Sequence, residues 1–443
     1  MDTPICDFVR HYAESGTLRL HMPGHKGADI LGMEQLDITE IHGADSLYEA
    51  SSIIAQSERN ASALFGCPTF YSTEGASLCI RAMVYLAMLH AKAQGKPPRI
   101  AAARNVHKTF LSAAALLDVQ VDWLFPEDET AYLSCSITAE HLENHFASTP
   151  VTPAAVYVTS PDYLGNMLDI GPLAEVCHRH GVLLLVDNAH GAYLRFLSAS
   201  RHPMDLGADL CCDSAHKTLP VLTGGAYLHV SSAMPDLATQ AKNALALFGS
   251  TSPSYLILQS LDAVNGILAD PAYSHSLTAL QLRVAACRQQ LTALAPVGDE
   301  PLKLTLHPRQ YGYTGTEMAN HLRKHGIECE FADPDFLVLM LTPAITSADL
   351  QRLVDTLTAL PRRDRIDTIP PLIPRPEAVM SIREAMLSPN ETIPVEQSLG
   401  RILAAPSVSC PPAVPILVCG EKIDEDAIRC FRYYGIERCT VIA

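Results

Sequence analysis

Three short apolar runs in the middle of the chain each end directly before polar residues whose types could do chemistry. The runs and the residues after them are Ile100–Ala103 with His107, Val182–Val186 with Asp187 and His190, and Ala208–Cys212 with Ser214, His216 and Lys217. If these runs are neighbouring strands, their polar residues meet in one crevice, because ligands of open α/β sheets bind outside the carboxyl ends of the strands. A carboxylate, an amine and several imidazoles would then share one site.

This set of groups fits the needs of pyridoxal 5′-phosphate (PLP). The cofactor withdraws electrons only while its pyridine nitrogen stays protonated, which a buried carboxylate such as Asp187 enforces. Its aldehyde requires a lysine that loses its proton near neutral pH, and Lys217 is the candidate. We expect His107 to stack on one face of the ring, while the small Ala189 leaves room on the other.

A phosphate group needs hydrogen-bond donors, which a helix N-terminus supplies through its free N–H groups. The candidate phosphate ligands are Gly75, Ala76 and Ser77, which open a long apolar helix predicted over Gly75–Leu89, together with Ser214 and His216. Taken singly, such an aspartate is more often a turn or N-cap residue, such a lysine is more often solvated, and such a histidine is more often structural. Their conjunction on consecutive strand ends favours a cofactor or phosphate site.

The elements that must position these residues can be predicted from hydrophobic pattern. Nearly continuous apolar runs are typical of strands buried on both faces. Further runs are Val121–Phe125, Ala154–Val158, Ala226–Val230 and Phe336–Leu341. Helical patterns lie between them, as in Leu173–His180, which is followed by Gly181 as a helix-ending residue. This alternation predicts an α/β protein with a mixed, mostly parallel sheet.

The sequence predicts five segments along the chain. Five prolines between positions 361 and 376 exclude a regular helix or central strand there, so this stretch reads as a linker. The predicted segments are an N-terminal segment (1–50), a cofactor-binding large domain (51–270), a small α/β domain (271–360), the proline-rich linker (361–376) and a C-terminal module (377–443).

Composition limits the class of protein further. The formal net charge of −16 argues against nucleic acid as a partner, because phosphate binding needs clustered Lys and Arg. The 13 cysteines include no Cys-x-x-Cys pair, so we expect neither a metal site nor a disulfide framework. The sequence shows no signal peptide and no run of about 18 apolar residues. We therefore expect a cytoplasmic protein that does not span a membrane.

Several motifs together resemble the bacterial ornithine/lysine/arginine decarboxylase family in its short form. The motifs are His21–Gly27 (HMPGHKG), Arg104–Lys108, Asp187–Ala192, Ser214–Leu219 (SAHKTL) and Thr251–Tyr255, and residues 411–416 resemble part of the family's C-terminal module. The resemblance implies the aspartate-aminotransferase-like fold type I, PLP as cofactor, and α-decarboxylation of arginine, lysine or ornithine. It also implies a homodimer with shared active sites.

The resemblance assigns roles to individual residues. Lys217 would form the Schiff base, Asp187 would pair with the pyridine nitrogen, and His190 would lie near the phenolic oxygen or the substrate carboxylate. Thr251 and Ser252 would reach the phosphate from the partner subunit. The sequence departs from the family pattern at a few positions, which are Glu74 in the phosphate turn, Asn188 in place of Glu, Tyr193 in place of His, Ala413 in place of Gly, and Cys419 in place of Pro.

Other readings stay open at this point. An aminotransferase or lyase of the same fold would fit the cofactor residues, and Arg309 is the candidate carboxylate clamp, although a solvated surface arginine is the more common case. A PLP-binding homologue without activity is a third reading. Glu74 and Asp162 are candidate partners for a cationic substrate side chain, although capping or solvated carboxylates are more common.

Overall fold

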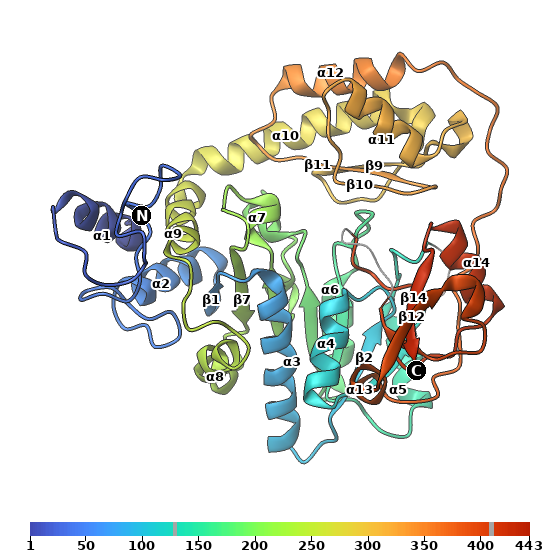
Figure 1. Cartoon of the computed structure of the whole chain (residues 1–443), viewed down its shortest axis with the longest axis horizontal. Coiled ribbons are helices and arrows are strands. Elements are labelled where there is room, and N and C mark those ends of the chain that lie inside the picture. Colours follow the sequence, from blue (N-terminus) through green and yellow to red (C-terminus); the bar gives the residue numbers. More distant parts are fainter. Residues whose placement is uncertain (127–130, 407–411) are drawn as a thin grey trace. The chain divides into compact units, whose positions relative to one another are not determined.

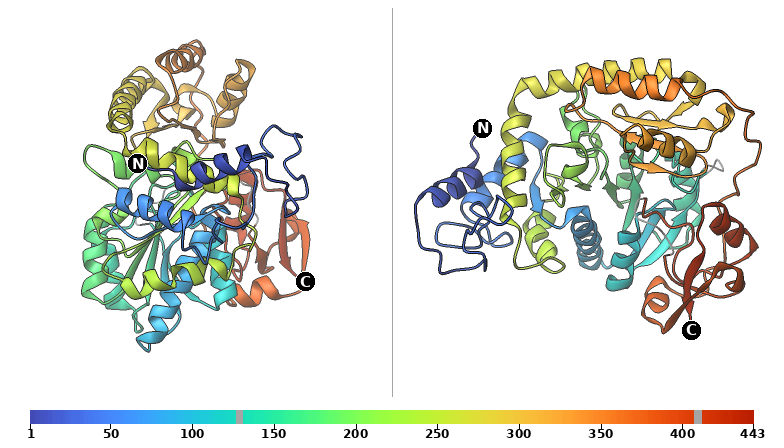
Figure 2. Two further views of the ribbon diagram at one scale, coloured as in Figure 1. Left: turned by 90° about the vertical axis from the view of Figure 1, so that its left-hand side faces the viewer. Right: turned by 45° about the horizontal axis from the view of Figure 1, so that its top comes forward.

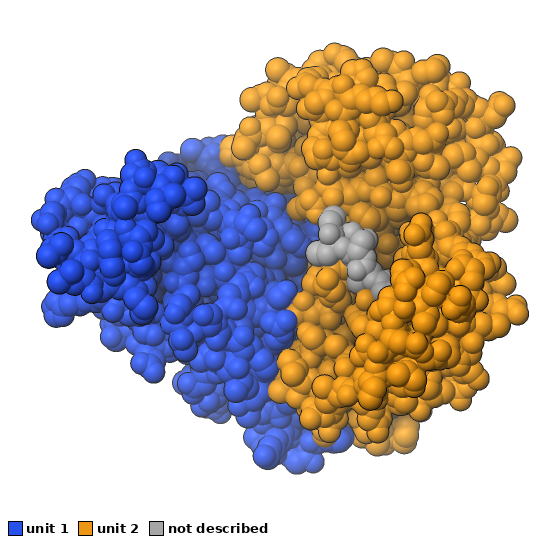
Figure 3. Space-filling model, in the orientation of Figure 1, with its two compact units in different colours: residues 1–97, 154–156, 170–275 blue, residues 98–153, 157–169, 276–443 orange. Residues whose placement is uncertain are grey.

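The computed structural model describes residues 1–126, 131–406 and 412–443. The chain forms two compact units, shown in two colours in Figure 3. Unit 1 contains residues 1–97, 154–156 and 170–275, and unit 2 contains residues 98–153, 157–169 and 276–443. Strand β4 (Ala155–Thr159) and helix α10 (Pro271–Gln290) contain residues of both units.

The largest sheet has seven strands in the order β1-β7-β6-β5-β4-β2-β3. Pairs β2–β3 and β5–β6 are parallel, whereas β7 is antiparallel to both of its neighbours. Every apolar run that we read as a strand is one, with ends within two residues of the prediction. These strands are β2 (Arg99–Ala103), β3 (Gln120–Leu124), β4, β5 (Leu183–Asp187), β6 (Leu210–Asp213), β7 (Ala226–Val230) and, in a second sheet, β11 (Leu337–Met340).

Unit 1 places its helices around β1, β5, β6 and β7 (Figure 1). Its remaining elements are α1 (Pro4–Glu14), α2 (Ile53–Phe65), β1 (Thr69–Ser72), α3 (Gly75–Ala93), α6 (Ile170–Arg179), η1 (Ala192–Phe196), η2 (Pro203–Leu206), α7 (Ala215–Thr218), α8 (Pro235–Ala246) and α9 (Tyr255–Ala269). The predicted helix before Gly181 is therefore α6, and Gly181 has the expected left-handed backbone with φ +64°.

Helix α3 is the central helix of unit 1. It packs against β1, β5, β6, β7 and α8, and most of its Leu, Ile, Met and Ala side chains are buried. By length and composition alone α3 could cross a membrane, although it contains Arg81 and Lys92 and is not an unbroken apolar run. A core helix of a large α/β protein has the same composition because it is covered by protein on most of its surface.

Helices α1, α2 and α9 pack together in unit 1, as both views in Figure 2 show. The N-terminus of α1 is held by a residue far along the chain, since the backbone N–H groups of Ile5 and Cys6 donate to Asp262 Oδ2 at 2.9 and 3.0 Å. Asp262 lies in α9 and also accepts from Ser57 in α2 at 2.5 Å. One buried carboxylate thus satisfies free N–H groups of α1 and joins three helices.

Unit 2 contains a four-stranded antiparallel sheet of order β10-β11-β9-β8 and a three-stranded antiparallel sheet of order β12-β14-β13. Its elements before residue 360 are β2, α4 (Lys108–Leu117), β3, α5 (Ala139–Ser148), η3 (Thr292–Leu294), β8 (Pro296–Val297), β9 (Lys303–Leu306), η4 (Pro308–Tyr311), α11 (Gly315–Lys324), β10 (Phe331–Ala332), β11 and α12 (Ser347–Thr358).

Residues 361–376 contain no helix or strand, as their prolines predict. The elements after them are α13 (Ile382–Leu387), β12 (Asn390–Pro394), η5 (Val395–Gln397), β13 (Leu403–Ala405), α14 (Glu425–Tyr433) and β14 (Arg438–Ile442). The five predicted segments remain our proposal for the domain organisation.

Candidate active site

Lys217 lies in unit 1, on the short helix α7 that directly follows β6. Its Nζ is 3.1 Å from His190 Nε2, within hydrogen-bond distance. His190 is buried and follows β5, the parallel neighbour of β6. The expected convergence of two strand ends therefore holds for this pair, and an imidazole lies where it can exchange a proton with the lysine amine.

Asp187 is the last residue of β5 and is 2% exposed. Its Oδ1 accepts the backbone N–H of Ala189 at 3.1 Å and the Cys212 thiol at 3.6 Å. Asp187 and Cys212 are paired in the parallel ladder, so their side chains point to the same face of the sheet. A carboxylate held in this way, away from water, is suited to keeping a proton on a nearby cationic nitrogen.

The turn before α3 is the predicted phosphate turn. Gly75 has φ +71°, its N–H donates to Gly224 O at 2.7 Å, and no side chain caps the start of α3. Glu74 Oε1 accepts the backbone N–H of Ser250 at 2.6 Å. The Glu74 carboxylate is thus hydrogen-bonded to the loop that precedes Thr251.

The other predicted phosphate ligands lie in unit 1 as well. Ser214 is buried and directly precedes α7. His216 Nδ1 lies 3.1 Å from Gly225 O, and because a carbonyl oxygen can only accept, Nδ1 is the donor in this hydrogen bond. Ala76 is buried in the first turn of α3 with Ser77 beside it. Thr251 and Ser252 are exposed in a loop before α9. Exposure is compatible with the predicted role in a partner's site, which remains a prediction.

His107 belongs to unit 2, where it is the N-cap residue of α4. Its Nδ1 accepts the backbone N–H of Thr109 at 3.2 Å and lies 2.9 Å from Thr109 Oγ1. An imidazole in the capping position has its ring orientation fixed by the helix it caps. The sequence did not predict this second task of His107.

The sequence did not predict a buried polar cluster at the end of β6. Asp213 Oδ2 accepts from His202 Nε2 and His229 Nε2, each at 3.0 Å, and all three side chains are fully buried. Burial by itself would raise the pKa of Asp213, but the charges and hydrogen bonds of both imidazoles lower it well below its ordinary value. Asp213 sits directly before the Ser214–Lys217 turn, so the cluster fixes the base of that turn.

Asn188 connects this cluster to Asp187. Its Nδ2 donates to Asp213 Oδ1 at 2.6 Å, and its own Oδ1 is buried without a partner among the described residues. The departure from the family's Glu at position 188 therefore has a physical reason, since a carboxylate there would face the carboxylate of Asp213. Gly191 is required beside it, because a Cβ at Gly191 would lie 2.0 Å from Asn188 Oδ1.

His202, Cys211 and Asp213 each offer a metal-ligand atom, and these atoms lie within 4.8 Å of one another. His202 Nδ1 accepts the N–H of Met204 at 3.3 Å, so its Nε2 carries the proton donated to Asp213. We therefore interpret the group as a hydrogen-bonded cluster.

Two other sequence-based readings change. Arg309 is not a solvated surface residue, because it is 5% exposed and Nη1 binds Asp335 Oδ1 at 2.8 Å. Its guanidinium is thereby committed and does not offer a free carboxylate clamp. Asp162 is also committed, since its carboxylate accepts the N–H groups of Leu164 and Asn166 at 2.9 Å. Asp162 shapes its own loop.

Residues 3–297 match the family model for the major domain of Orn/Lys/Arg decarboxylases. The chain belongs to the Orn/Lys/Arg decarboxylase family. The predictions of family and of PLP as the family's cofactor are thereby confirmed. The chain is 29% identical to the arginine decarboxylase of Halalkalibacterium halodurans, over 97% of this chain and 93% of the relative. It is also 29% identical to the arginine decarboxylase of Bacillus subtilis, over 96% of this chain and 92% of the relative.

Solved structures share the decarboxylase fold. A lysine decarboxylase of Francisella novicida superposes with a TM-score of 0.80 at 16% identity, covering 100% of this chain and 81% of that one. A high-resolution structure of SPT with PLP superposes with a TM-score of 0.57 at 13% identity, covering 80% of this chain and 83% of that one. The predicted fold class, PLP fold type I, is confirmed.

Proposed function

We propose that this member of the family is a PLP-dependent α-decarboxylase of arginine, and that Lys217 holds the cofactor. The observation that carries the proposal is the arrangement of the strand ends in unit 1. There, Lys217 Nζ lies 3.1 Å from His190, and the buried carboxylate of Asp187 ends the adjacent strand. This combination of amine, imidazole and desolvated carboxylate is what PLP chemistry requires.

The residues fit the cofactor group by group. Asp187 would pair with the pyridine nitrogen and keep it protonated, because a carboxylate close to a nitrogen favours the charged, protonated form of that nitrogen. Gly75, Ala76 and Ser77 would receive the phosphate with Ser214 and His216, while Glu74 Oε1 accepts the backbone N–H of Ser250. Ala189 and His107 would contact the two faces of the ring, and Thr251 and Ser252 would complete the phosphate site from a partner subunit.

When bound, PLP supplies an electron-withdrawing ring that accepts the electron pair left on Cα as carbon dioxide departs. The chain's residues manage the proton that replaces the carboxylate. Lys217 is the group we assign to deliver that proton to Cα, and His190 is placed to return a proton to Nζ afterwards. One carboxylate carbon leaves as carbon dioxide and one proton enters, so the product is the amine of the same side chain.

The choice of arginine rests on the curated relatives that match nearly the whole chain, four of which are arginine decarboxylases at 26–29% identity. Lysine and ornithine are the competing substrates. Lysine and ornithine differ from each other by one methylene, which is worth only about 1–3 kcal/mol of discrimination, so pocket shape decides between those two.

A cytoplasmic homodimer is part of the proposal. Several large apolar side chains near the HMPGHKG motif are exposed in the single chain, which are Leu18, Leu20, Met22, Ile30 and Leu31. Exposed apolar groups in such number are typical of a protein–protein interface. The negative net charge supports a small-molecule enzyme with no nucleic-acid partner.

The test measures carbon dioxide release from arginine, lysine and ornithine by purified protein with PLP, alongside its visible absorption spectrum. Release from arginine, lost together with the bound-cofactor band in Lys217→Ala, supports the proposal. Lys92→Ala is the matched control, because Lys92 is exposed near the end of α3 and should leave both signals unchanged.

Release from lysine or ornithine alone would overturn the choice of substrate. A cofactor band without carbon dioxide from any of the three would overturn decarboxylation, and the products would then separate an aminotransferase or lyase from an inactive homologue.

A further inference from the structure

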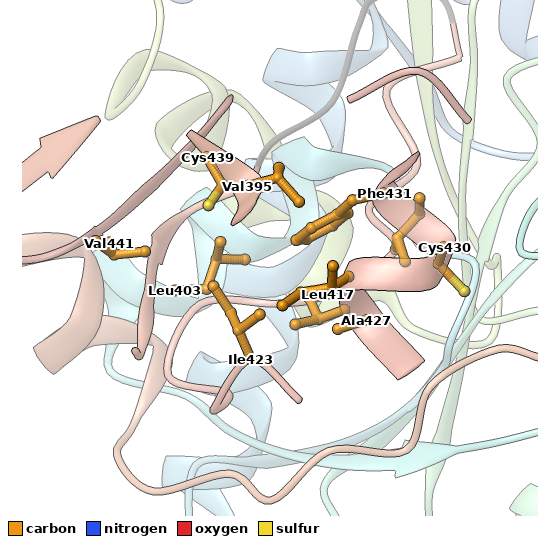
Figure 4. Close-up of a cluster of buried hydrophobic side chains, with 11 residues drawn as sticks. Val395, Leu403, Leu417, Ile423, Ala427, Cys430, Phe431, Cys439 and Val441 are labelled. Atoms are coloured by element: carbon orange, nitrogen blue, oxygen red, sulfur yellow. The ribbon is translucent and has the colours of Figure 1, made fainter. Parts of the chain in front are cut away.

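Residues 377–406 and 412–443, here called the C-terminal module, have a hydrophobic core of their own. The sheet β12-β14-β13 and helix α14 enclose buried side chains that include Leu403, Leu417, Ile423 and Phe431 (Figure 4). A packed core of this kind makes the module a firm support for whatever its surface contacts. Within unit 2, its surface contacts the segment that carries His107.

The first contact lies just before His107. Arg104 Nη2 donates to Glu421 Oε2 at 2.8 Å, and both side chains are 3% exposed. Arg104 also donates to Ile416 O at 3.2 Å, so the module supplies all of the oxygen acceptors seen for this guanidinium. Among the described residues its Nε and Nη1 have no partner. Glu421 is itself fixed, because its Oε2 accepts the N–H of Val418 at 2.8 Å.

The second contact lies just after His107. The N–H of Lys108, the first residue of α4, donates to Ala413 O at 2.8 Å. This N–H has no acceptor within the helix, so the module satisfies a group that would otherwise need water. Ala413 is buried and has φ +56°, a backbone conformation that is unfavourable for alanine. The C-terminal module thus holds Ala413 in an unfavourable backbone conformation at its contact with α4.

The third contact lies at the far end of the same helix. Arg383, in α13, donates from Nη1 to Ala115 O at 2.8 Å and to Leu116 O at 3.1 Å. These are carbonyls of the last turn of α4, where a cation is favourable because of the helix dipole. The C-terminal module therefore binds α4 at both ends and binds the strand end that leads into it.

We propose that the C-terminal module fixes the position of the His107 imidazole, with Glu421, Ala413 and Arg383 as positioning residues. His107 lies between the first two contacts, and as the N-cap residue it moves with the first turn of α4. The inference rests on the proposed function in one respect, namely that His107 contacts the cofactor ring. The module would thus act on the cofactor through α4.

The experiment compares Glu421→Gln and Arg383→Ala with two matched controls in the full-length holoenzyme. The controls are Glu391→Gln, which alters the exposed pair with Arg401, and Arg438→Ala, whose guanidinium donates to Thr392 O within the module. Three signals are measured, which are amide exchange of residues 104–112, circular dichroism of the bound cofactor, and kcat. Arg383→Ala leaves no buried charge behind, so it keeps the test valid if Glu421→Gln fails to fold.

We expect both test variants to exchange the amides of residues 104–112 about tenfold faster than the controls, with changed cofactor dichroism and lower kcat. If folded Arg383→Ala exchanges these amides at the wild-type rate, the contact of Arg383 with α4 does not fix residues 104–112. Faster exchange with unchanged dichroism and kcat would overturn the positioning of His107. His107→Ala separates the two proposals, because an unaltered cofactor signal in that variant would remove the role of His107 itself, whatever the exchange shows.

Discussion

Replacing Asp213 with asparagine should lower the free energy of unfolding by about 3–5 kcal/mol at pH 7, because it removes a buried carboxylate and leaves buried donors without an acceptor. The carboxylate accepts from four side chains, which are His202 and His229 at 3.0 Å, Asn188 at 2.6 Å and the Cys211 thiol at 3.8 Å. An asparagine side chain can accept at only one of its two ends. Its NH₂ group would therefore face a donor, either the amide of Asn188 or the imidazole of His202, whose tautomer is fixed by Met204.

The pH dependence of this loss follows from the low pKa of Asp213 in the folded protein. A carboxylate whose pKa falls on folding contributes stability that is present above its unfolded value, about 3.9, and is lost as the pH falls further. The difference in free energy of unfolding between wild type and Asp213→Asn should therefore have its full value at pH 7 and should become smaller below about pH 4.

Urea unfolding at fixed protein concentration, with and without PLP, measures this difference. Asp205→Asn is the control, because Asp205 pairs with Arg195 in a partly exposed position and such pairs contribute about 0–1 kcal/mol. A loss below about 1 kcal/mol for Asp213→Asn would refute the reasoning, since it would mean that the two imidazoles do not depend on a charged partner.

Three further predictions concern other single positions. Burial raises the pKa of Asp333 to about 7, so its carboxyl group favours folding at low pH and this contribution is lost as the pH rises through 7. Asp333→Asn should thus raise stability by about 2–4 kcal/mol above pH 7 and hardly at all at pH 4, in thermal or urea unfolding. Ala413→Gly should raise stability by up to about 1 kcal/mol, because glycine adopts φ +56° without strain, and a decrease would contradict this. Gly191→Ala should lower the free energy of unfolding by about 1–3 kcal/mol and weaken PLP binding in a cofactor titration, because its Cβ would overlap Asn188 Oδ1. Wild-type stability and PLP affinity in this variant would contradict the packing assigned to Gly191.

Six of the seven strands of the large sheet were predictable because they are continuous apolar runs, and polar residues at the ends of three of them belong to the candidate site. Strand β1, whose sequence is Thr-Phe-Tyr-Ser, is not such a run and was missed. Asp187 ends β5, and His190 and Lys217 follow β5 and β6, which are parallel neighbours, so strand order alone brings them together. This part of the site depends on local pattern plus one rule of sheet topology.

The partners of these residues were not predictable in the same way. His202 and His229 reach Asp213 from η2 and β7, and no sequence spacing indicates which histidine faces which carboxylate. Arg309 was misjudged for a similar reason. An arginine after Pro308 resembles a surface turn residue, but the tertiary structure buries it against Asp335. The network that orients a site depends on long-range packing, which composition and periodicity do not encode.

The cap on α1 has a consequence for how the chain is made. The N–H groups of Ile5 and Cys6 find their acceptor in Asp262, 257 and 256 residues later. During synthesis the ribosome releases the first helix long before it releases α9, and domains normally begin to fold as they emerge. Here the amino-terminal helix cannot complete its docking until more than half of the chain has been translated. Helix α2 emerges early and can cover part of α1, but the surface of α1 that packs on α9 stays uncovered during that interval.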